Sequence, residues 1–266
     1  MRSINSMKTA LIGAGNVATH IALALYGSGV DIVQVYSRDI AHSAAIAHKV
    51  GALPIDDMAK IDDSIDVFLF AVKDDAITEL LKRAGKKDVL MIHTAGSVSM
   101  DVFKEYTGNY GALYPLQTFS KSKAVNFAEI PVFIEASNDE AERQIEELAR
   151  KLSPEIHFVN SEQRKKIHLA AVFACNFTNF LYDISAEIVA EAGLPFDVLK
   201  PLIAETADKI KTLSPREAQT GPAVRGDKQT MNAHLELLKE RPDLQRLYTE
   251  LSDGIKLGIG TPSSVF

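Results

Sequence analysis

Glycines and small residues near the start of the chain are spaced for binding a phosphate group. The motif Gly13-x-Gly15-x-x-Ala18 follows a short apolar segment, 10–12, and precedes a segment with helical periodicity. Gly13 permits a tight turn, Gly15 lets the backbone approach a pyrophosphate, and Ala18 lets helix and strand pack closely. In this strand–turn–helix context the motif predicts a dinucleotide site at a helix N-terminus, with a glycine turn in another α/β sheet as the alternative. We expect the pyrophosphate to contact Gly13, Ala14, Gly15, Asn16 and Val17.

The residues after the second predicted strand indicate which dinucleotide binds. An acidic side chain here would accept a hydrogen bond from the ribose 2′-hydroxyl of NAD. The strand instead ends in Ser37 and Arg38, which could hold the 2′-phosphate of NADP, Arg38 through bidentate hydrogen bonds. We therefore expect NADP as the cofactor. Asp39 could serve NAD if the strand ended later, and Arg38 could be an ordinary solvated turn residue.

Three further loops follow predicted strands and should border the same site, because ligands of open α/β sheets bind beyond the carboxyl ends of strands. Expected cofactor contacts are Ala71, Val72, Lys73, Thr94, Ala95 and Gly96, and expected substrate contacts are His93, Ser97, Tyr114 and Gln117. Small residues at 94–96 would let a nicotinamide ring lie against the backbone, and Pro115 would fix the turn that orients Tyr114 and Gln117. The alternatives are a surface lysine at Lys73 and a structural hydrogen-bonding role for His93.

A polar stripe on a long apolar helix is the second candidate for chemistry. At about 100° per residue, Asn179, Asp183 and Asn176 lie within about 80° of His168 around the helix axis. The other residues of this stretch are mostly apolar on every side, which predicts a buried helix whose polar groups need partners. The stripe could face a substrate cleft, with Asn179 as a substrate contact, or form a structural network with other helices or a second subunit.

A loop near residues 218–227 carries the candidate ligand for a substrate carboxylate. Two glycines and a proline define this loop, and Arg225 presents the planar fork of donors that matches a carboxylate. A salt bridge that fixes the loop is the alternative for Arg225. Asp227 is expected to cap the following helix.

The order of the predicted elements indicates two domains. Predicted strands are 10–12, 31–36, 52–55, 66–72, 89–93, 111–114, 132–135 and 157–159, with helices at 17–27, 40–50, 76–84, 100–106 and 138–151. From residue 160 onward only helices are predicted, at 161–192, 196–213, 228–240 and 242–257. This alternation predicts an α/β fold, with a Rossmann-type, doubly wound and mainly parallel sheet over 1–159 and an all-helical substrate and dimerisation domain over 160–266.

Composition limits the classes of partner. A net charge of −6 argues against nonspecific binding to nucleic acid or a membrane. Cys175 is the single cysteine, which excludes an intramolecular disulfide or a cysteine-cluster metal site and is typical of the cytoplasm. The scattered histidines do not indicate a metal. We expect a small-molecule substrate and a homodimer formed through the helical domain, since so apolar a helix needs cover.

Together these residues resemble the 6-phosphogluconate dehydrogenase-like superfamily. The overall plan is similar to pyrroline-5-carboxylate reductase and ketopantoate reductase, and more closely to a bacterial family of Rossmann-like proteins with a short helical C-terminal domain, largely of unassigned function. The matching segments are 13–18, 71–73, 93–97, 114–117, 168–179 and 219–227. The resemblance implies an NADP-dependent oxidoreductase, with a small 2-oxo acid such as ketopantoate as a candidate substrate.

One catalytic position of the related reductases differs in this chain. Ketopantoate reductases and β-hydroxyacid dehydrogenases have a catalytic lysine four residues before an asparagine on the long helix. Asn176 could match the asparagine, but the preceding position is Val172, and Lys165 and Lys166 lie too far before it. We therefore expect another proton donor. His168 is our choice, because an imidazole can donate and recover a proton near neutral pH.

Two classes of function fit these residues. In the first, NADPH reduces a small carboxylate-bearing carbonyl or imine, with Asn176 orienting the substrate, Arg225 holding its carboxylate and His168 protonating it. In the second, the chain is a non-catalytic NADP-binding sensor or interaction protein, which the missing lysine favours. A reductase for a deazaflavin cofactor is a third alternative.

Overall fold

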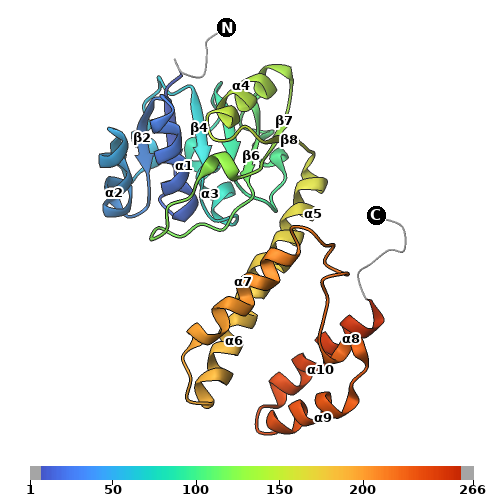
Figure 1. The fold of residues 1–266 in the computed structure, drawn as a ribbon. Coiled ribbons are helices and arrows are strands. Elements are labelled where there is room, and N and C mark those ends of the chain that lie inside the picture. The colour runs from blue at the N-terminus through green and yellow to red at the C-terminus, as the bar shows by residue number, and fades with distance from the viewer. Residues whose placement is uncertain (1–6, 259–266) are drawn as a thin grey trace. The chain divides into compact units, whose positions relative to one another are not determined.

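Eight β-strands form a single sheet, and helices connect most of them (Figure 1). The computed structural model describes residues 7–258. Within these residues the strands are β1 Thr9–Ile12, β2 Ile32–Tyr36, β3 Leu53–Ile55, β4 Val67–Phe70, β5 Leu90–His93, β6 Tyr110–Pro115, β7 Val132–Ala136 and β8 Ile156–Phe158. Their order is β3-β2-β1-β4-β5-β6-β7-β8, and neighbouring strands are parallel except β6 and β7. The predicted α/β class, a doubly wound sheet followed by a helical region, is confirmed.

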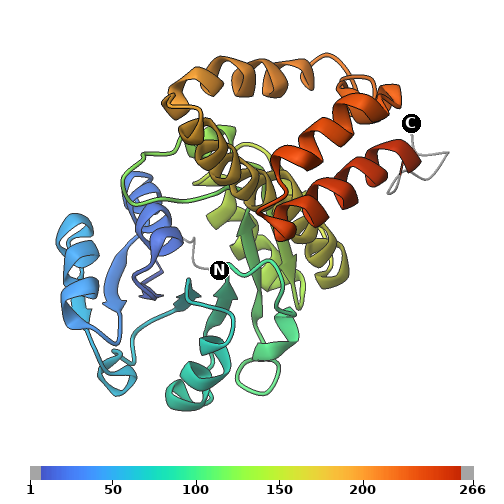
Figure 2. The same ribbon diagram turned by 90° about the horizontal axis from the view of Figure 1, so that it is seen from below.

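Helices cover both faces of the sheet (Figures 1 and 2). One face packs against α1 Asn16–Gly27, α2 Ile40–Val50, α4 Asp139–Arg150 and the 3₁₀ turn η4 Phe127–Glu129; the other packs against α3 Ala76–Ala84 and the 3₁₀ turns η2 Met58–Lys60 and η3 Met100–Phe103. In α4, Ala141, Ile145 and Leu148 are buried at the spacing of one helix face. Asn138 caps this helix, accepting hydrogen bonds from the backbone N–H groups of its first turn.

Parallel pairing aligns the carboxyl ends of the central strands. Ile12 of β1 lies opposite Phe70 of β4, and Phe70 lies opposite His93 of β5. Ile12 also lies opposite Tyr36 of β2. The loops after these four strands therefore leave the sheet at one edge, which is where open α/β sheets bind ligands.

The helical part begins with three consecutive segments, α5 Ser161–Ala171, the π-helix η5 Val172–Phe177 and α6 Thr178–Glu191. Contacts divide the chain within α6, into a first unit that ends at Leu181 and a second unit that begins at Tyr182. This differs from the boundary expected at residues 159 and 160. The difference arises because α5 is attached to the sheet by a buried side chain, Arg164, described below.

The second unit contains the rest of α6 and shorter helices. These are the 3₁₀ turn η6 Phe196–Leu199, α7 Lys200–Lys209, α8 Pro222–Arg225, α9 Lys228–Leu237 and α10 Pro242–Leu257. Only α8 was not predicted. Arg241 pairs with Glu187 and Glu191 of α6 at 2.6 and 3.4 Å, and so ties the start of α10 to that helix. No helix among the described residues is long and apolar enough to cross a membrane.

Two expectations for the long helix were wrong. The stripe calculation assumed one regular helix, but in η5 the hydrogen bonds run from i to i+5, so the angles around the axis change after Val172. The helix was also expected to be buried, yet no residue of η5 or α6 is buried in the single chain. The residues of one chain cover only part of a helix that is apolar on all sides, so Asn176, Asn179 and Asp183 are exposed.

Candidate functional site

The glycine-rich turn is fixed against the end of β4. Gly13 has φ of +125°, and an added Cβ would lie 2.2 Å from the carbonyl oxygen of Ala71, so only glycine fits. The Gly13 N–H donates to the carbonyl of Tyr36 at 2.9 Å, and the Ala71 N–H donates to that of Ile12 at 2.8 Å. The turn is therefore held on both sides by the ends of neighbouring strands.

The N-terminus of α1 has the features of an anion site. Its N-cap residue, Gly15, offers no side-chain cap, and the first turn contains no acidic residue. A Cβ added at Gly15 would meet nothing within 4 Å. Space therefore lies next to uncapped helix N–H groups, where the helix dipole favours negative charge. The residues present fit a pyrophosphate at Ala14, Asn16 and Val17.

A distant segment closes one side of this turn. The amide nitrogen Nδ2 of Asn16 donates to the carbonyl of Phe119 at 2.9 Å, and Nε2 of His20 bonds to the carbonyl of Ser120 at 2.8 Å. These contacts bring the segment after β6 onto the start of α1. Gln117 belongs to this segment and is exposed, with its side-chain oxygen accepting from the Thr118 N–H at 2.8 Å.

The polar residues that follow β2 differ in their contacts. Asp39 is the N-cap of α2, and its carboxylate accepts the N–H of Ala41 at 2.8 Å. Among the described residues none pairs with the side chain of Arg38, which is exposed, and Ser37 is partly exposed beside it. The Asp39 carboxylate, which could have bound a ribose hydroxyl, is used to cap α2. The guanidinium of Arg38 is available to bind an anion.

His93, at the end of β5, is buried and makes a local hydrogen bond. Its side chain is fully buried, and Nδ1 accepts the N–H of Ala95 at 3.2 Å. Burial and the charge of Arg164 lower the pKa of His93 from 6.5 to about 3, so the imidazole is neutral near pH 7. Of the two alternatives given for His93, the geometry favours the structural hydrogen bond, and the substrate contact stays a prediction.

The loop after β5 lies against α5. Within this loop Gly96 is buried, and a Cβ there would lie 2.5 Å from Nδ1 of His168. The same nitrogen is hydrogen-bonded to the hydroxyl of Tyr114 at 3.0 Å. Burial raises the pKa of the Tyr114 hydroxyl, which therefore stays protonated at neutral pH. The structure thus brings together Gly96, Tyr114 and His168, which the sequence placed in three separate segments.

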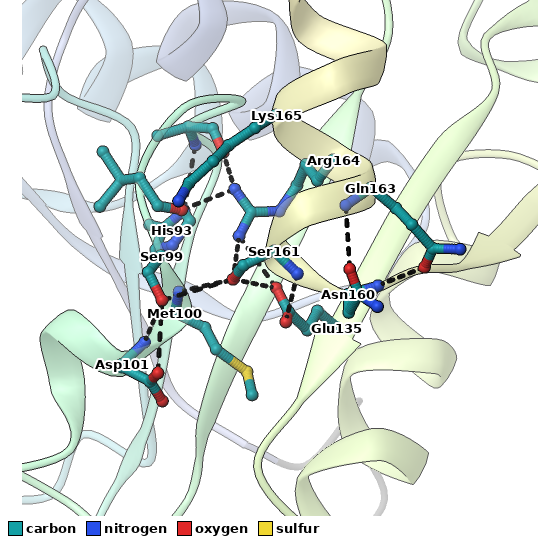
Figure 3. A network of polar contacts seen from close by, with 12 residues as sticks. His93, Ser99, Met100, Asp101, Glu135, Asn160, Ser161, Gln163, Arg164 and Lys165 are labelled. Carbon is teal, nitrogen blue, oxygen red and sulfur yellow. Dashed lines mark hydrogen bonds and ion pairs between the residues drawn. The ribbon is translucent and has the colours of Figure 1, made fainter.

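Polar contacts that the sequence did not suggest surround this loop. Ser97 donates a hydrogen bond to the carboxylate of Asp74, which joins the loops after β4 and β5. Lys73 precedes Asp74 and is exposed, and Val72 is partly exposed. Arg164 and Glu135 form a buried ion pair at 2.9 Å next to the loop (Figure 3). Arg164 could have been noticed, because it lies one helical turn before His168. No sequence pattern links Glu135, on β7, to Arg164 or His168.

Other predicted site residues lie on the helical segments that follow α5. Asn176 and Asn179 are exposed on η5 and α6 of the first unit. Arg225 is exposed at the end of α8 in the second unit. Asp227 caps α9, accepting from the N–H and hydroxyl of Thr230 at 3.0 and 2.7 Å, as expected. The substrate roles of Asn176, Asn179 and Arg225 stay predictions.

Comparisons with known proteins match two separate stretches of the chain to family models. Residues 1–101 match the family model of shikimate / quinate 5-dehydrogenase, and residues 130–255 match that of a domain of unknown function (DUF2520). A solved structure of a candidate NADP oxidoreductase from Bacteroides fragilis is 47% identical with a TM-score of 0.91, and the match covers 96% of this chain and 99% of that one. A search of curated proteins found no match.

More distant structures share the fold. A Thermotoga maritima protein is 22% identical with a TM-score of 0.71, over 93% of this chain and 96% of that one. A 1-pyrroline-5-carboxylate reductase from Streptococcus pyogenes is 15% identical with a TM-score of 0.63, over 95% and 99%. At these identities the likeness concerns the fold alone. The resemblance inferred from the sequence motifs is confirmed.

The lowered pKa of His93 predicts a pH-dependent stability. Between pH 6.5 and about 3 the unfolded chain binds a proton at this residue and the native chain does not, so stability falls as pH falls through that window. We expect a loss of about 2 kcal/mol between pH 7 and pH 5, at about 1.4 kcal/mol per pH unit below 6.5. Urea unfolding at pH 7, 6 and 5 measures it. His93→Asn should remove this slope, while exposed His48→Asn should keep it; equal slopes in wild type and His93→Asn would contradict the assignment.

The contact between Gly96 and His168 predicts a steric effect. Gly96→Ala should reduce the free energy of unfolding by about 1–3 kcal/mol, because the new Cβ overlaps the imidazole ring. Gly108→Ala is the matched control, since a Cβ there meets nothing within 4 Å and the effect on the unfolded chain is the same. Urea unfolding compares the two variants, and equal stabilities would show that the loop does not press against His168.

Proposed function

The chain belongs to the same family of Rossmann-like proteins as the candidate NADP oxidoreductase of Bacteroides fragilis, and from this premise we propose that it is an NADP(H)-dependent reductase of a small carbonyl or imine compound bearing a carboxylate. The observation that carries the proposal is the uncapped N-terminus of α1 beside open space at Gly15. This N-terminus lies at the edge where the ends of β1, β4 and β5 align.

The polar residues after β2 support NADP over NAD. The 2′-phosphate carries negative charge and several acceptor oxygens, which the exposed guanidinium of Arg38 and the hydroxyl of Ser37 can bind. The carboxylate of Asp39 would repel a phosphate but is engaged as the cap of α2. The expected preference for NADPH over NADH is about tenfold or more, the value of one charge-assisted hydrogen bond.

His168 and Tyr114 are the proposed proton-handling pair. A bound NADPH would supply hydride to the substrate carbon, and the substrate oxygen or nitrogen then needs a proton. His168 in its charged form can donate from Nε2 while its Nδ1–H donates to the Tyr114 oxygen. Once Nε2 has given up its proton, the remaining proton stays on Nδ1 and still donates to the Tyr114 oxygen, so the 3.0 Å contact holds the ring in both states. His168 is partly exposed and can regain a proton from water.

Substrate contacts in the proposal come from polar residues near this pair and on the helices. Asn176 would orient the reacting group, and Arg225 would bind the substrate carboxylate through its fork of donors. Ser97 and Gln117 are exposed at the loops around the site and add polar contacts. A 2-oxo acid such as ketopantoate carries both groups that this set needs, a carbonyl and a carboxylate.

Binding and turnover assays test the function. NADPH and NADH are titrated by fluorescence, and NADPH oxidation is then followed with 2-oxo acids, including ketopantoate, and with cyclic imines. We expect binding of NADPH and oxidation with at least one compound. His168→Ala should lower turnover about 100-fold or more, the usual contribution of a general acid, with the Kd for NADPH within about twofold. Exposed His48→Ala is the control.

The outcomes separate the alternatives. A wild-type protein that binds neither coenzyme would refute the proposal. Binding without oxidation by any compound of the panel would support the non-catalytic sensor instead. Turnover that His168→Ala leaves unchanged would assign the proton to another residue.

The exposed apolar side chains of the long helix support a homodimer. Leu169, Phe173, Phe177 and Phe180 are all about half exposed or more, and Phe173 reaches 63%. The rings of Phe173 and Phe177 contact each other edge to face, with centroids 5.0 Å apart. No helix among residues 7–258 is long and apolar enough to cross a membrane, so an exposed apolar surface of this kind supports an interface with another protein chain. A second copy is its proposed partner, because two-fold dimers are the commonest assembly.

Light scattering at micromolar concentration tests the dimer. The wild-type chain should have twice its mass of 29.0 kDa, and Phe173→Glu should have the mass of one chain, since a buried glutamate without a partner is costly. Leu53→Glu makes the same type of change at an exposed residue of β3 and should leave the mass unchanged. A wild-type mass of a single chain would refute the dimer.

A further inference from the structure

Arg164 is a buried cation that no proposed step uses. Its side chain is fully buried on α5, and Nη1 donates to the carbonyl oxygens of Ala95 and Val98 at 2.7 Å each and of Gly96 at 3.3 Å. A single guanidinium group therefore holds three carbonyl groups of the loop after β5. This is the loop whose backbone the proposed site uses for the nicotinamide ring.

We infer that Arg164 is a positioning residue that shapes this loop, residues 94–98, as the surface for the nicotinamide ring and holds it beside His168. The inference rests on the proposed function, which it deepens. Arg164 touches neither cofactor nor substrate in this assignment. It acts through the backbone of the loop.

A fixed counter-charge sets the orientation of Arg164. Nη2 donates to Oε2 of Glu135 at 2.9 Å and to the Ser161 hydroxyl at 3.1 Å. Glu135 in turn accepts the Ser161 N–H on Oε1 at 2.6 Å and the Ser161 hydroxyl on Oε2 at 2.7 Å. Both carboxylate oxygens are thus engaged, and β7, the start of α5 and the loop meet at one ion pair. Figure 3 shows these contacts among Arg164, Glu135 and Ser161.

The same helix face connects this ion pair to the proton-handling pair. Arg164 and His168 are one helical turn apart and therefore lie on one side of α5. Arg164 holds the carbonyl of Gly96, and the Cα of Gly96 lies so close to His168 that a Cβ would overlap the ring. A shift of the loop would thus change the distance between the nicotinamide surface and the proton donor. Charge-assisted hydrogen bonds to three carbonyls oppose such a shift.

His93 anchors the loop from its other side. Its Nδ1 accepts a hydrogen bond from the Ala95 N–H, and Arg164 donates one to the Ala95 carbonyl. Both backbone polar groups of Ala95 are therefore hydrogen-bonded. Nδ1 can accept only in the neutral imidazole, and the low pKa of His93 ensures that form. This gives the buried histidine a role that agrees with its lack of exposure.

A purely structural role predicts a different result from a positioning role. A buried ion pair often contributes little net stability, because desolvation of both charges offsets their attraction. If Arg164 only stabilised the fold, its replacement would affect all ligands alike. If it shapes the nicotinamide surface, only ligands that carry the ring should be affected.

The test compares two probes on the full-length protein. Arg164→Lys keeps the positive charge opposite Glu135 but cannot reach three carbonyls at once. We expect its Kd for NADPH to rise about tenfold, and its Kd for 2′-phospho-ADP-ribose, which lacks the nicotinamide ring, to stay within about twofold of wild type. The fluorescence enhancement of bound NADPH should also fall. Arg150→Lys, which changes the exposed pair with Glu146, is the matched control and should change neither Kd.

A second variant keeps the inference testable if Arg164→Lys does not fold. Glu135→Gln preserves size, but its amide NH₂ group cannot accept, so one of the contacts to Arg164 or Ser161 is lost. This variant should raise the Kd for NADPH about threefold and leave the Kd for 2′-phospho-ADP-ribose unchanged. Equal weakening of both probes, or no weakening in a folded variant, would overturn the positioning role alone. A wild-type protein that binds neither probe would overturn the proposed function itself.

Discussion

Parallel alignment of β1, β4 and β5 is the constraint on which the rest of the structure depends. Because Ile12, Phe70 and His93 lie opposite one another, the loops that follow them must share one edge. The contact of Gly13 with the Ala71 carbonyl then leaves no room for a side chain at the first turn. The proposed phosphate surface and the loops around it follow from strand register and close backbone packing, before any catalytic side chain is considered.

A buried charge is the second constraint, because it decides how the helical part meets the sheet. A guanidinium group removed from water needs acceptors for its donors, and β7 and the loop after β5 supply them for Nη1 and Nη2 of Arg164. Those acceptors are available only if Ser161 begins the helix beside Glu135. The capping box of Asn160 and Gln163 fixes that start independently. The direction of α5 is therefore determined by polar geometry rather than by apolar packing.

The sequence predicted what depends on local pattern. The Gly13 turn, the helix over 40–50 and the end of β5 follow from spacing within a few residues, and all were predicted close to their observed bounds. The Arg164–Glu135 pair could not be predicted, because the two residues are far apart in the chain and neither type is unusual on the surface. The π-helix Val172–Phe177 has no clear signal in composition. Exposure of α6 also escaped prediction, since hydrophobicity indicates that a helix needs cover but not which chain supplies it.

His168 lies on α5 between two regions of opposite character. One turn before it, the helix is fixed to the sheet by buried charges, and five residues after it begins the exposed aromatic surface at Phe173. The π-helix starts just before that surface and widens the turn there. The geometry of the proposed proton-handling pair is therefore set from the polar side, by Arg164 and Tyr114, whereas the proposed partner would pack on the apolar side without moving the ring. This separation would let one helix serve both the proposed site and the proposed interface.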